Sequence, residues 1–159
     1  MQQSEMVRQA MRRWASGVAV VTSRAEDIIH GMTVNSFTSV SLDPPIISLS
    51  LAHATRTIAL VRETGILAIT FLSENQQELS DIFAGRTPED ADRFSGLETF
   101  TMLSGAPLLA GGLACLDCRV VFSYPMATST LFLAEVLAVS HVQEGRPLLY
   151  FNRGYARMA

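Results

Sequence analysis

The chain opens with apolar residues at helical spacing and then changes to short, β-rich runs. The recurring apolar positions of the opening segment are Met6, Val7, Ala10, Met11 and Trp14. Charged residues take the opposite face, and Gly17 follows as a stop signal. This pattern predicts an amphipathic helix at the start of the chain.

From Val18 onward, β-branched runs separated by turn residues predict a meander of strands. The first runs read VAVVTS, HGMTVNSFTSVSL and, after the Pro44-Pro45 break, IISLSL. The run ILAITFL predicts a buried strand. Two long strands are expected at 113–124 and 130–142 around a turn that contains Pro125, with a last short strand at 148–151.

Three short helices are predicted between these strands. Thr55 is placed to cap a helix that runs through Glu63 and ends at Gly65. Ser73 and Gln76 form a capping-box pattern ahead of Leu79, Ile82 and Phe83, which share one helical face. The sequence TPED at 87–90 predicts a further helix that carries residues 91–94.

Many short strands with a few helices, no βαβ rhythm and no internal repeat indicate a mainly β protein with helical decoration, most simply a closed antiparallel barrel. No linker or shift in composition divides the chain. The 159 residues are therefore expected to form one domain, 1–159, around one core.

Composition narrows the classes of function. Charged residues make up only 17% of the chain and hydrophobic ones 48%, which indicates an additional buried face against a partner. The net charge of −3 offers no broad basic field, so nucleic acid is not expected as a ligand.

The opening segment is charged where a signal peptide is apolar, so we expect a cytoplasmic protein. The longest charge-free run, 99–116, holds three glycines and a proline, so no membrane span is expected.

No metal site is predicted. Cys115 and Cys118 form a lone CxxC, and on one strand their side chains would point to opposite faces. His30, His53 and His141 have no carboxylate or cysteine at metal-binding spacing.

The segment GMTVNSFTSVSLDPP carries the clearest chemical pattern. In one continuous strand, alternate positions would sort onto two faces. The first face would hold Met32, Val34, Ser36, Thr38, Val40 and Leu42, and the second Thr33, Asn35, Phe37, Ser39 and Ser41. The second face is a row of hydroxyls and an amide, which suits a polar heterocycle, a ribityl chain or phosphate oxygens. The alternative is a sheet wall whose hydroxyl face meets water.

The phrase HGMTVNSFTSVSLDPPIISLSL resembles the flavin-binding segment of the flavin reductase-like family. The resemblance continues through SGVAVVTS, FLSENQQELSDIFAG, DRFSGLETF, ACLDCRVV and PLLYFNRGYARM, in the family's order and over nearly the whole chain. It implies an antiparallel split β-barrel that forms a homodimer. It also implies an NAD(P)H-dependent flavin reductase that reduces FMN or FAD by direct hydride transfer and supplies reduced flavin to a separate monooxygenase.

The resemblance also assigns residues. Thr33, Asn35 and Ser36 are expected at the ribityl and phosphate end of the flavin, and Ser39, Val40 and Ser41 along its isoalloxazine ring. The second flavin-binding stretch corresponds to Ser50, Leu51, Ala52, Thr55 and Arg56. A guanidinium beside a helix N-terminus favours a phosphate, which supports Arg56 on chemical grounds as well; a solvated surface arginine is the alternative.

The remaining assignments each have a plainer alternative. Phe83 matches an aromatic residue near the ring system, but its spacing from Leu79 fits core packing equally well. Arg153 and Tyr155 match positions near the active site, with packing of an edge strand as the alternative. His53 is adjacent to the expected phosphate, although a surface turn would also hold a histidine.

Two departures from the family bear on the reductant. Many members have Gly-Asp-His-Thr entering the long penultimate strand, whereas this chain has Ala127-Thr128-Ser129-Thr130. Ser129 therefore stands where a histidine lies near the nicotinamide. Hydride transfer depends on the stacking and distance of the two rings, so no catalytic acid or base is assigned. The replacement of the family histidine by Ser129 is instead expected to affect binding of the reductant. No extra basic cluster marks a 2′-phosphate site, so NADH is expected over NADPH.

Two other functions stay open on the sequence. One is a flavin-binding or other flat-cofactor-binding module that does not turn over nicotinamide, which the missing histidine favours. The other is an oxidase of the pyridoxamine-phosphate type on a related barrel.

Overall fold

A computed structural model describes residues 2–86, 92–140 and 142–159. Three α-helices are present in this part of the chain, α1 (Gln3–Met11), α2 (Arg56–Thr64) and α3 (Gln77–Phe83). The strands of the large sheet are β2 (Ala19–Ala25), β3 (Ile28–Val34), β4 (Thr38–Leu42), β5 (Pro45–Ala52), β6 (Ile66–Phe71), β9 (Ala114–Pro125) and β10 (Ser129–Ser140). The short strands are β1 (Ser16–Gly17), β7 (Thr99–Phe100), β8 (Leu108–Leu109), β11 (Leu149–Phe151) and β12 (Gly154–Ala156).

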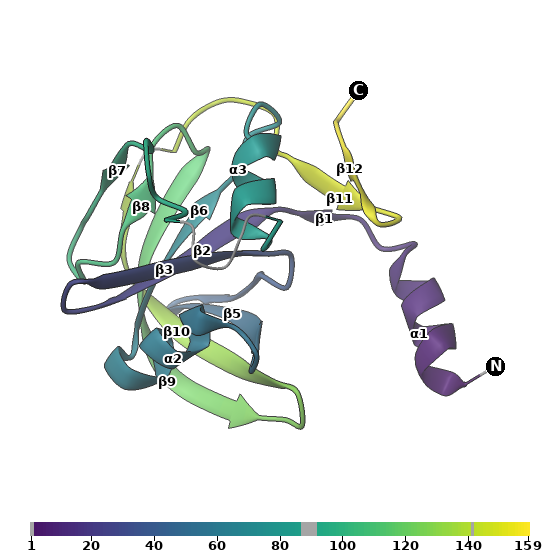
Figure 1. Cartoon of the computed structure of the whole chain (residues 1–159), viewed down its shortest axis with the longest axis horizontal. Helices are drawn as coiled ribbons and strands as arrows, with labels where there is room; N and C mark the ends of the chain where they lie inside the picture. The colour runs from purple at the N-terminus through teal and green to yellow at the C-terminus, as the bar shows by residue number, and fades with distance from the viewer. Residues whose placement is uncertain (1, 87–91, 141) are drawn as a thin grey trace.

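The seven long strands form one antiparallel sheet in the order β3-β2-β6-β9-β10-β5-β4 (Figure 1). The two edge strands, β3 and β4, are consecutive in the sequence, and only residues 35–37 separate them. The four Cα steps from Val34 to Thr38 span at most about 14 Å, so the sheet must curve until its two edges come close together. The mainly β, antiparallel class expected from the sequence is confirmed.

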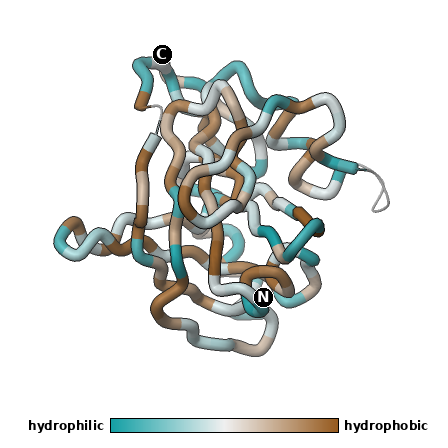
Figure 2. The backbone as a smooth tube through the Cα atoms, turned by 90° about the vertical axis from the view of Figure 1, so that its left-hand side faces the viewer, coloured by the Kyte–Doolittle hydropathy of each residue, from teal (hydrophilic) through white to brown (hydrophobic). Residues whose placement is uncertain are grey.

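The main core lies on the inner face of this curved sheet. Buried side chains from six of the seven strands and from α2 pack together there, among them Val21, Leu49, Ile58, Leu67 and Phe132. A second cluster around Phe83 and Leu148 fastens α3 and the C-terminal hairpin to β2. Figure 2 shows apolar stretches through the middle of the molecule and polar stretches on most outlying loops. Both clusters include residues of β2, so the large sheet, α3 and the C-terminal hairpin pack together.

The amphipathic helix at the start of the chain is confirmed as α1, but it has no buried residue. It extends away from the sheet in Figure 1. Its apolar face is uncovered in the single chain: Met6 is 58% exposed, Met11 57% and Trp14, just after the helix, 71%.

The prediction of one continuous strand over HGMTVNSFTSVSL was wrong. The chain turns at residues 35–37, so β3 and β4 are separate strands, and the alternation of faces does not carry across the turn. Val34 is buried, whereas Val40 and Leu42, expected on its face, are 53% and 87% exposed. Phe37, expected among the hydroxyls, packs against the core and meets Phe71 edge to face at 4.9 Å.

Most other predicted elements are confirmed. The two long strands and the short helices α2 and α3 lie within a few residues of the expected bounds, and Gly65 ends α2 in the left-handed region at φ 69°. Gln76 accepts the backbone N–H of Ser73 at 2.9 Å, which is one half of the expected capping box, but the helix begins at Gln77. Residues 87–91 of the helix predicted from TPED lie outside the described residues, whereas residues 92–94, expected to belong to it, are not helical, so that part of the prediction was wrong.

The two cysteines lie on opposite faces of β9, as the spacing predicted. Both are free and buried, Cys118 in the main core and Cys115 in a small cluster with Ala68 and Leu108. The described residues contain no group of His, Cys, Asp and Glu side chains able to hold a metal ion.

Candidate functional site

A groove of about 1070 Å³ lies between α1 and the body of the protein. Its walls come from α1 and the segment after it, from the turn between β3 and β4, and from the turn between β11 and β12. Asn35, Ser36 and Arg153 are the residues assigned by resemblance that line it. Phe37, Phe71 and Tyr150 give it an aromatic floor. The groove therefore joins the first predicted flavin-binding stretch to the C-terminal hairpin.

Ser36 fixes the turn between β3 and β4 against β5. Its hydroxyl donates to the carbonyl of Ser50 and accepts the backbone N–H of Ser50, both at 3.1 Å. These two bonds join the first and second predicted flavin-binding stretches. Asn35, one residue earlier, has no such contact among the described residues, and its exposed amide is available to a ligand.

β4 is an edge strand with a bulge at Val40. Ser39 pairs with Ile47 and Ser41 with Ile46, so Val40 is left without a partner in the register. A bulge at an edge turns side chains outward. Ser39 and Val40 are exposed, and Ser41 is half-buried.

The second stretch runs from the end of β5 into α2. Leu51 is fully buried, so its side chain belongs to the core and only its backbone is available at the site. Ala52 is exposed, and its carbonyl accepts the Thr55 hydroxyl at 2.8 Å. Thr55 is the N-cap residue of α2, but its side chain does not cap the helix, because it is bound to Ala52. The first turn of α2 therefore has no side-chain cap, and the exposed Arg56 side chain lies in that turn.

Ser129 lies directly opposite Ala52. The two residues pair in the register of β10 and β5, and the backbone N–H of His53 donates to the carbonyl of Thr128 at 2.9 Å. His53 also places its Nε2 3.0 Å from the Thr130 hydroxyl. The loop that departs from the family pattern thus adjoins the second predicted flavin-binding stretch.

Tyr155 connects the C-terminal hairpin to α3. Its hydroxyl donates to Asp81 Oδ1 at 2.9 Å and lies 2.7 Å from Ser80 Oγ, so the Ser80 hydroxyl is the donor in that second bond. Arg86 pairs with Asp81 at 2.7 Å and lies over the Tyr155 ring at 5.9 Å. Burial is the main reason that the pKa of Tyr155 is raised, and the nearby Asp81 carboxylate raises it further, so the phenol stays protonated at neutral pH.

Arg153, two residues before Tyr155, has a strained backbone. Asn152 and Arg153 have φ values of 50° and 66°, which is the left-handed pair required by a tight turn between antiparallel strands. An arginine adopts this region at a cost of about 1 kcal/mol. The turn places the exposed Arg153 side chain at the groove.

The chain matches the model of the flavin reductase like domain over residues 11–159. It belongs to that family. It is 39% identical to an NADH-dependent flavin reductase of Rhodococcus over 94% of this chain and 83% of the relative. It is 33% identical to the reductase component of 4-hydroxyphenylacetate 3-monooxygenase from Thermus thermophilus over 97% of this chain and 96% of the relative.

Comparison with a solved structure also shows that the fold is that of a flavin reductase. The NADH:FAD oxidoreductase SgcE6 of Streptomyces globisporus, in complex with NAD and FAD fragments, superposes with a TM-score of 0.88 at 29% identity. The match covers 99% of this chain and 93% of that one. The family's fold therefore extends over the whole of the described chain.

Thr33 and Phe83 are more deeply placed than their assigned roles suggest. The Thr33 hydroxyl donates to the carbonyl of Ser80 at 2.6 Å, so it fastens β3 to α3. Phe83 is 1% exposed and meets Phe94 edge to face at 5.1 Å, which is the core packing left open by the sequence. Gly31 is needed beside it, because a Cβ there would lie 3.1 Å from the Phe83 ring.

The structure thus gathers the assigned residues at two neighbouring places. Asn35, Ser36 and Arg153 share the groove, whereas Ala52, Arg56 and Ser129 lie where β5, α2 and β10 meet. Sequence reasoning missed Ser80 and Asp81, because no motif marks a serine and an aspartate that act on a tyrosine far along the chain. No helix in the described ranges is long and apolar enough to cross a membrane.

Proposed function

We propose that this protein is an NADH-dependent flavin reductase that reduces FMN or FAD and supplies reduced flavin to a partner monooxygenase. The observation that carries the proposal is the match to the flavin reductase like domain over residues 11–159. Relatives of this chain include an NADH-dependent flavin reductase and a reductase component of a monooxygenase.

The residues present fit a flavin. Asn35 offers an exposed amide, and Ser39 and Ser41 offer hydroxyls at an edge strand, which suits the polar edge of a heterocycle and a ribityl chain. The first turn of α2 offers backbone N–H groups without a side-chain cap, and Arg56 adds one guanidinium. This combination of neutral donors and a single cation suits a phosphate monoester at the end of the ribityl chain.

Binding and orientation are the tasks that we assign to the protein. The bound flavin would supply the redox chemistry by accepting a hydride from the nicotinamide. Ser129, opposite Ala52, and Arg153, at the groove, approach this region from two sides and are proposed to hold the reductant. Tyr155 is proposed to fix the hairpin that carries Arg153. NADH is proposed over NADPH.

We propose further that the curved sheet is a split β-barrel and that the protein is a homodimer. The short connection between the edge strands β3 and β4 supports the first part. The uncovered apolar face of α1, with Trp14 71% exposed, supports the second, because such a face is stable in water when another surface covers it. A cytoplasmic location is part of the proposal.

The decisive experiment is NADH consumption by the purified protein with added FMN, with added FAD or with neither, in parallel with NADPH. Flavin-dependent oxidation of NADH is the expected result, and the initial rates rank the two flavins and the two reductants. Tight flavin binding without consumption of either reductant would contradict the proposal and favour a flavin-binding module. Amine oxidation without NADH would favour an oxidase of the pyridoxamine-phosphate type.

A further inference from the structure

The end of β10 that carries Ser129 has little core packing of its own. Ser129 and Ala52 pair with each other at the ends of their strands, β10 and β5. Residues 121–128, which form the tip of the long hairpin before Ser129, are all exposed, and Thr130 is the first buried residue of β10. Strand ends beside an exposed tip open easily. The position of Ser129 therefore depends on contacts made by its neighbours.

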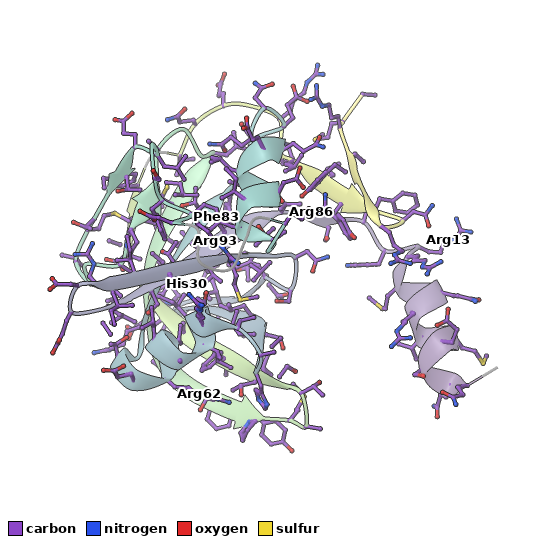
Figure 3. All side chains as sticks on the ribbon, in the orientation of Figure 1. Arg13, His30, Arg62, Phe83, Arg86 and Arg93 are labelled. Atoms are coloured by element: carbon purple, nitrogen blue, oxygen red, sulfur yellow. The ribbon has the colours of Figure 1, made fainter. Side chains whose placement is uncertain are left out.

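Thr130 provides the main contact, on the inner face of the sheet. Its side chain is 2% exposed and lies on the same side of β10 as the core residue Phe132, opposite to the side chain of Ser129. Its Oγ1 lies 3.0 Å from Nη2 of Arg62 and 3.0 Å from Nε2 of His53. Arg62 belongs to the last turn of α2, and His53 follows β5, so one hydroxyl joins three segments. Figure 3 shows Arg62 in the lower part of the view, where α2 approaches the hairpin of β9 and β10.

The Thr130 hydroxyl can satisfy both of its partners. A guanidinium only donates, so Arg62 donates to Oγ1. The hydroxyl keeps its own hydrogen and a second lone pair, and it can therefore donate to Nε2 of His53 or accept from it. Neither contact leaves a polar group of Thr130 unpaired.

The backbone of the same corner is also fixed. The N–H of His53 donates to the carbonyl of Thr128 at 2.9 Å, and the N–H of Met126 donates to the carbonyl of Ser129 at 2.8 Å. His53 therefore holds the residues on both sides of Ser129: Thr128 through its backbone and Thr130 through its ring.

Arg62 connects this corner to the helix at the proposed flavin site. The main core fixes α2 through Ile58 and Val61, each 1% exposed. The first turn of α2 carries Arg56, which is proposed to bind the flavin phosphate, and the last turn carries Arg62. One helix therefore extends from the proposed phosphate site to the end of β10 that carries Ser129.

We propose that Arg62 and His53 are positioning residues of the reductant site, which act through the Thr130 hydroxyl to hold Ser129 in place for NADH. The inference rests on the proposed function, because Ser129 is there assigned to the reductant. Both residues act from the inner face of the sheet, whereas the Ser129 side chain lies on the outer face. Loss of these contacts should weaken binding of NADH and leave flavin binding nearly unchanged, since the core still fixes α2.

Variants of the full chain test the inference. Thr130→Val keeps the shape of the side chain and removes the hydroxyl, whereas Thr130→Ser keeps a hydroxyl. His53→Phe keeps a ring without nitrogens. Arg62→Met removes the guanidinium of an exposed residue, so it tests the contact even if Thr130→Val does not fold. Thr64→Val is the matched control, because the Thr64 hydroxyl donates within α2, to the carbonyl of Leu60 at 2.8 Å. Thermal melting establishes that each variant is folded.

Two measurements separate the anchoring of the corner from its effect on the reaction. Hydrogen exchange of the His53 and Met126 amides reports how firmly the corner is held and needs no activity. Kinetics with NADH and saturating FMN give KM and kcat, and a flavin titration gives the dissociation constant for FMN.

In Thr130→Val, we expect both amides to exchange about tenfold faster and the KM for NADH to rise about tenfold. Arg62→Met and His53→Phe each remove one contact and should cause smaller rises. Thr130→Ser and Thr64→Val should remain close to the unaltered protein. In every variant, kcat and the dissociation constant for FMN should change less than about twofold.

Unchanged amide exchange in the variants that lose a contact would overturn the inference, because the hydroxyl would then anchor nothing. Faster exchange with an unchanged KM for NADH would overturn it as well, because the contacts would then serve the fold alone. A KM that rises in parallel with the dissociation constant for FMN would have the same meaning. Failure of the unaltered protein to oxidise NADH would instead contradict the proposed function, and the exchange measurement would still test the anchor.

Discussion

The hydroxyl of Tyr155 lies 2.7 Å from Ser80 Oγ and fastens the C-terminal hairpin to α3. The carbonyl of the same Ser80 accepts the hydroxyl of Thr33, on β3. One serine therefore links β3, which leads to the proposed flavin-binding turn, with the hairpin that carries Arg153. The two walls of the groove are held in register through α3.

Replacing Tyr155 by phenylalanine tests this link. Tyr155→Phe removes the hydrogen bond to the Ser80 hydroxyl and the one to the Asp81 carboxylate, which keeps its ion pair with Arg86, so we expect the free energy of unfolding to fall by about 1 kcal/mol. Because Arg153 loses its anchor, the KM for NADH should rise more than kcat falls. Tyr150→Phe is the control, since the Tyr150 hydroxyl has no hydrogen bond among the described residues. Equal effects of the two variants would contradict the link.

Removing single donors at the proposed flavin site should weaken binding without unfolding the protein. Asn35 and Arg56 are exposed, so Asn35→Ala and Arg56→Ala remove hydrogen-bond donors and no core volume. We expect each to raise the dissociation constant for FMN about tenfold with an unchanged melting temperature. Flavin titrations and thermal melts measure the two effects. Unchanged affinity in both variants would refute the assignment of these residues.

Restoring a histidine at position 129 should improve use of the reductant. Ser129 lies opposite Ala52, so an imidazole introduced by Ser129→His would lie beside the second proposed flavin-binding stretch. We expect a lower KM for NADH, measured at saturating flavin. Ser129→Asn, which adds bulk and an amide but no ring, is the control. A KM that stays constant in Ser129→His would place the nicotinamide elsewhere.

Arg153 should show opposite effects on stability and on function. Its φ of 66° suits glycine better than arginine, so Arg153→Gly should raise the stability by up to about 1 kcal/mol. The same change removes the cation from the groove and should raise the KM for NADH. Denaturant unfolding and steady-state kinetics give the two numbers. Arg153→Lys keeps the positive charge and the left-handed backbone. It should therefore change both the free energy of unfolding and the KM for NADH less than Arg153→Gly does.

The cysteines should resist modification in the folded protein. Burial and, to a smaller extent, the Asp117 charge raise the pKa of Cys118 to about 12, and burial raises that of Cys115 as well. At pH 8 both thiols are protonated and covered, so a thiol reagent should label them only after unfolding. A group whose pKa rises on folding stabilises the folded state below its unfolded pKa. The contribution of Cys118 to the free energy of unfolding is therefore complete below about pH 9 and is lost as the pH rises toward 12. Rapid labelling of the native protein at pH 8 would contradict the burial.

The sequence predicts the local elements of this fold better than it predicts their contacts. Hydrophobic periodicity identifies α1, α2, α3 and the long strands, because each pattern is contained within one element. It fails at Val34, Val40 and Leu42, because the turn fixed by Ser36 and the bulge at Val40 each reset the alternation of faces.

Contacts between distant segments explain the rest of what the sequence missed. Thr55 was expected to cap α2, but the nearby carbonyl of Ala52 takes its hydroxyl instead. The hydrogen bond from Thr33 to the carbonyl of Ser80 is not apparent from the sequence, because only the packing of α3 against β3 brings the two residues together. No spacing rule covers residues that meet in this way.

The pairing of β5 with β10 also limits the order in which the strands of the sheet can pair during folding. β5 finds its second neighbour only in a strand that is made much later, since Ala52 pairs with Ser129. During synthesis, β5 can pair with β4, but its other edge has no strand partner until residues 129–140 leave the ribosome. Contacts between residues so distant along the chain slow folding. Until β10 is in place, the unpaired edge of β5 can pair with other nascent chains. The junction of β5 and α2, where Arg56 lies, is thus among the last parts of the molecule to be completed.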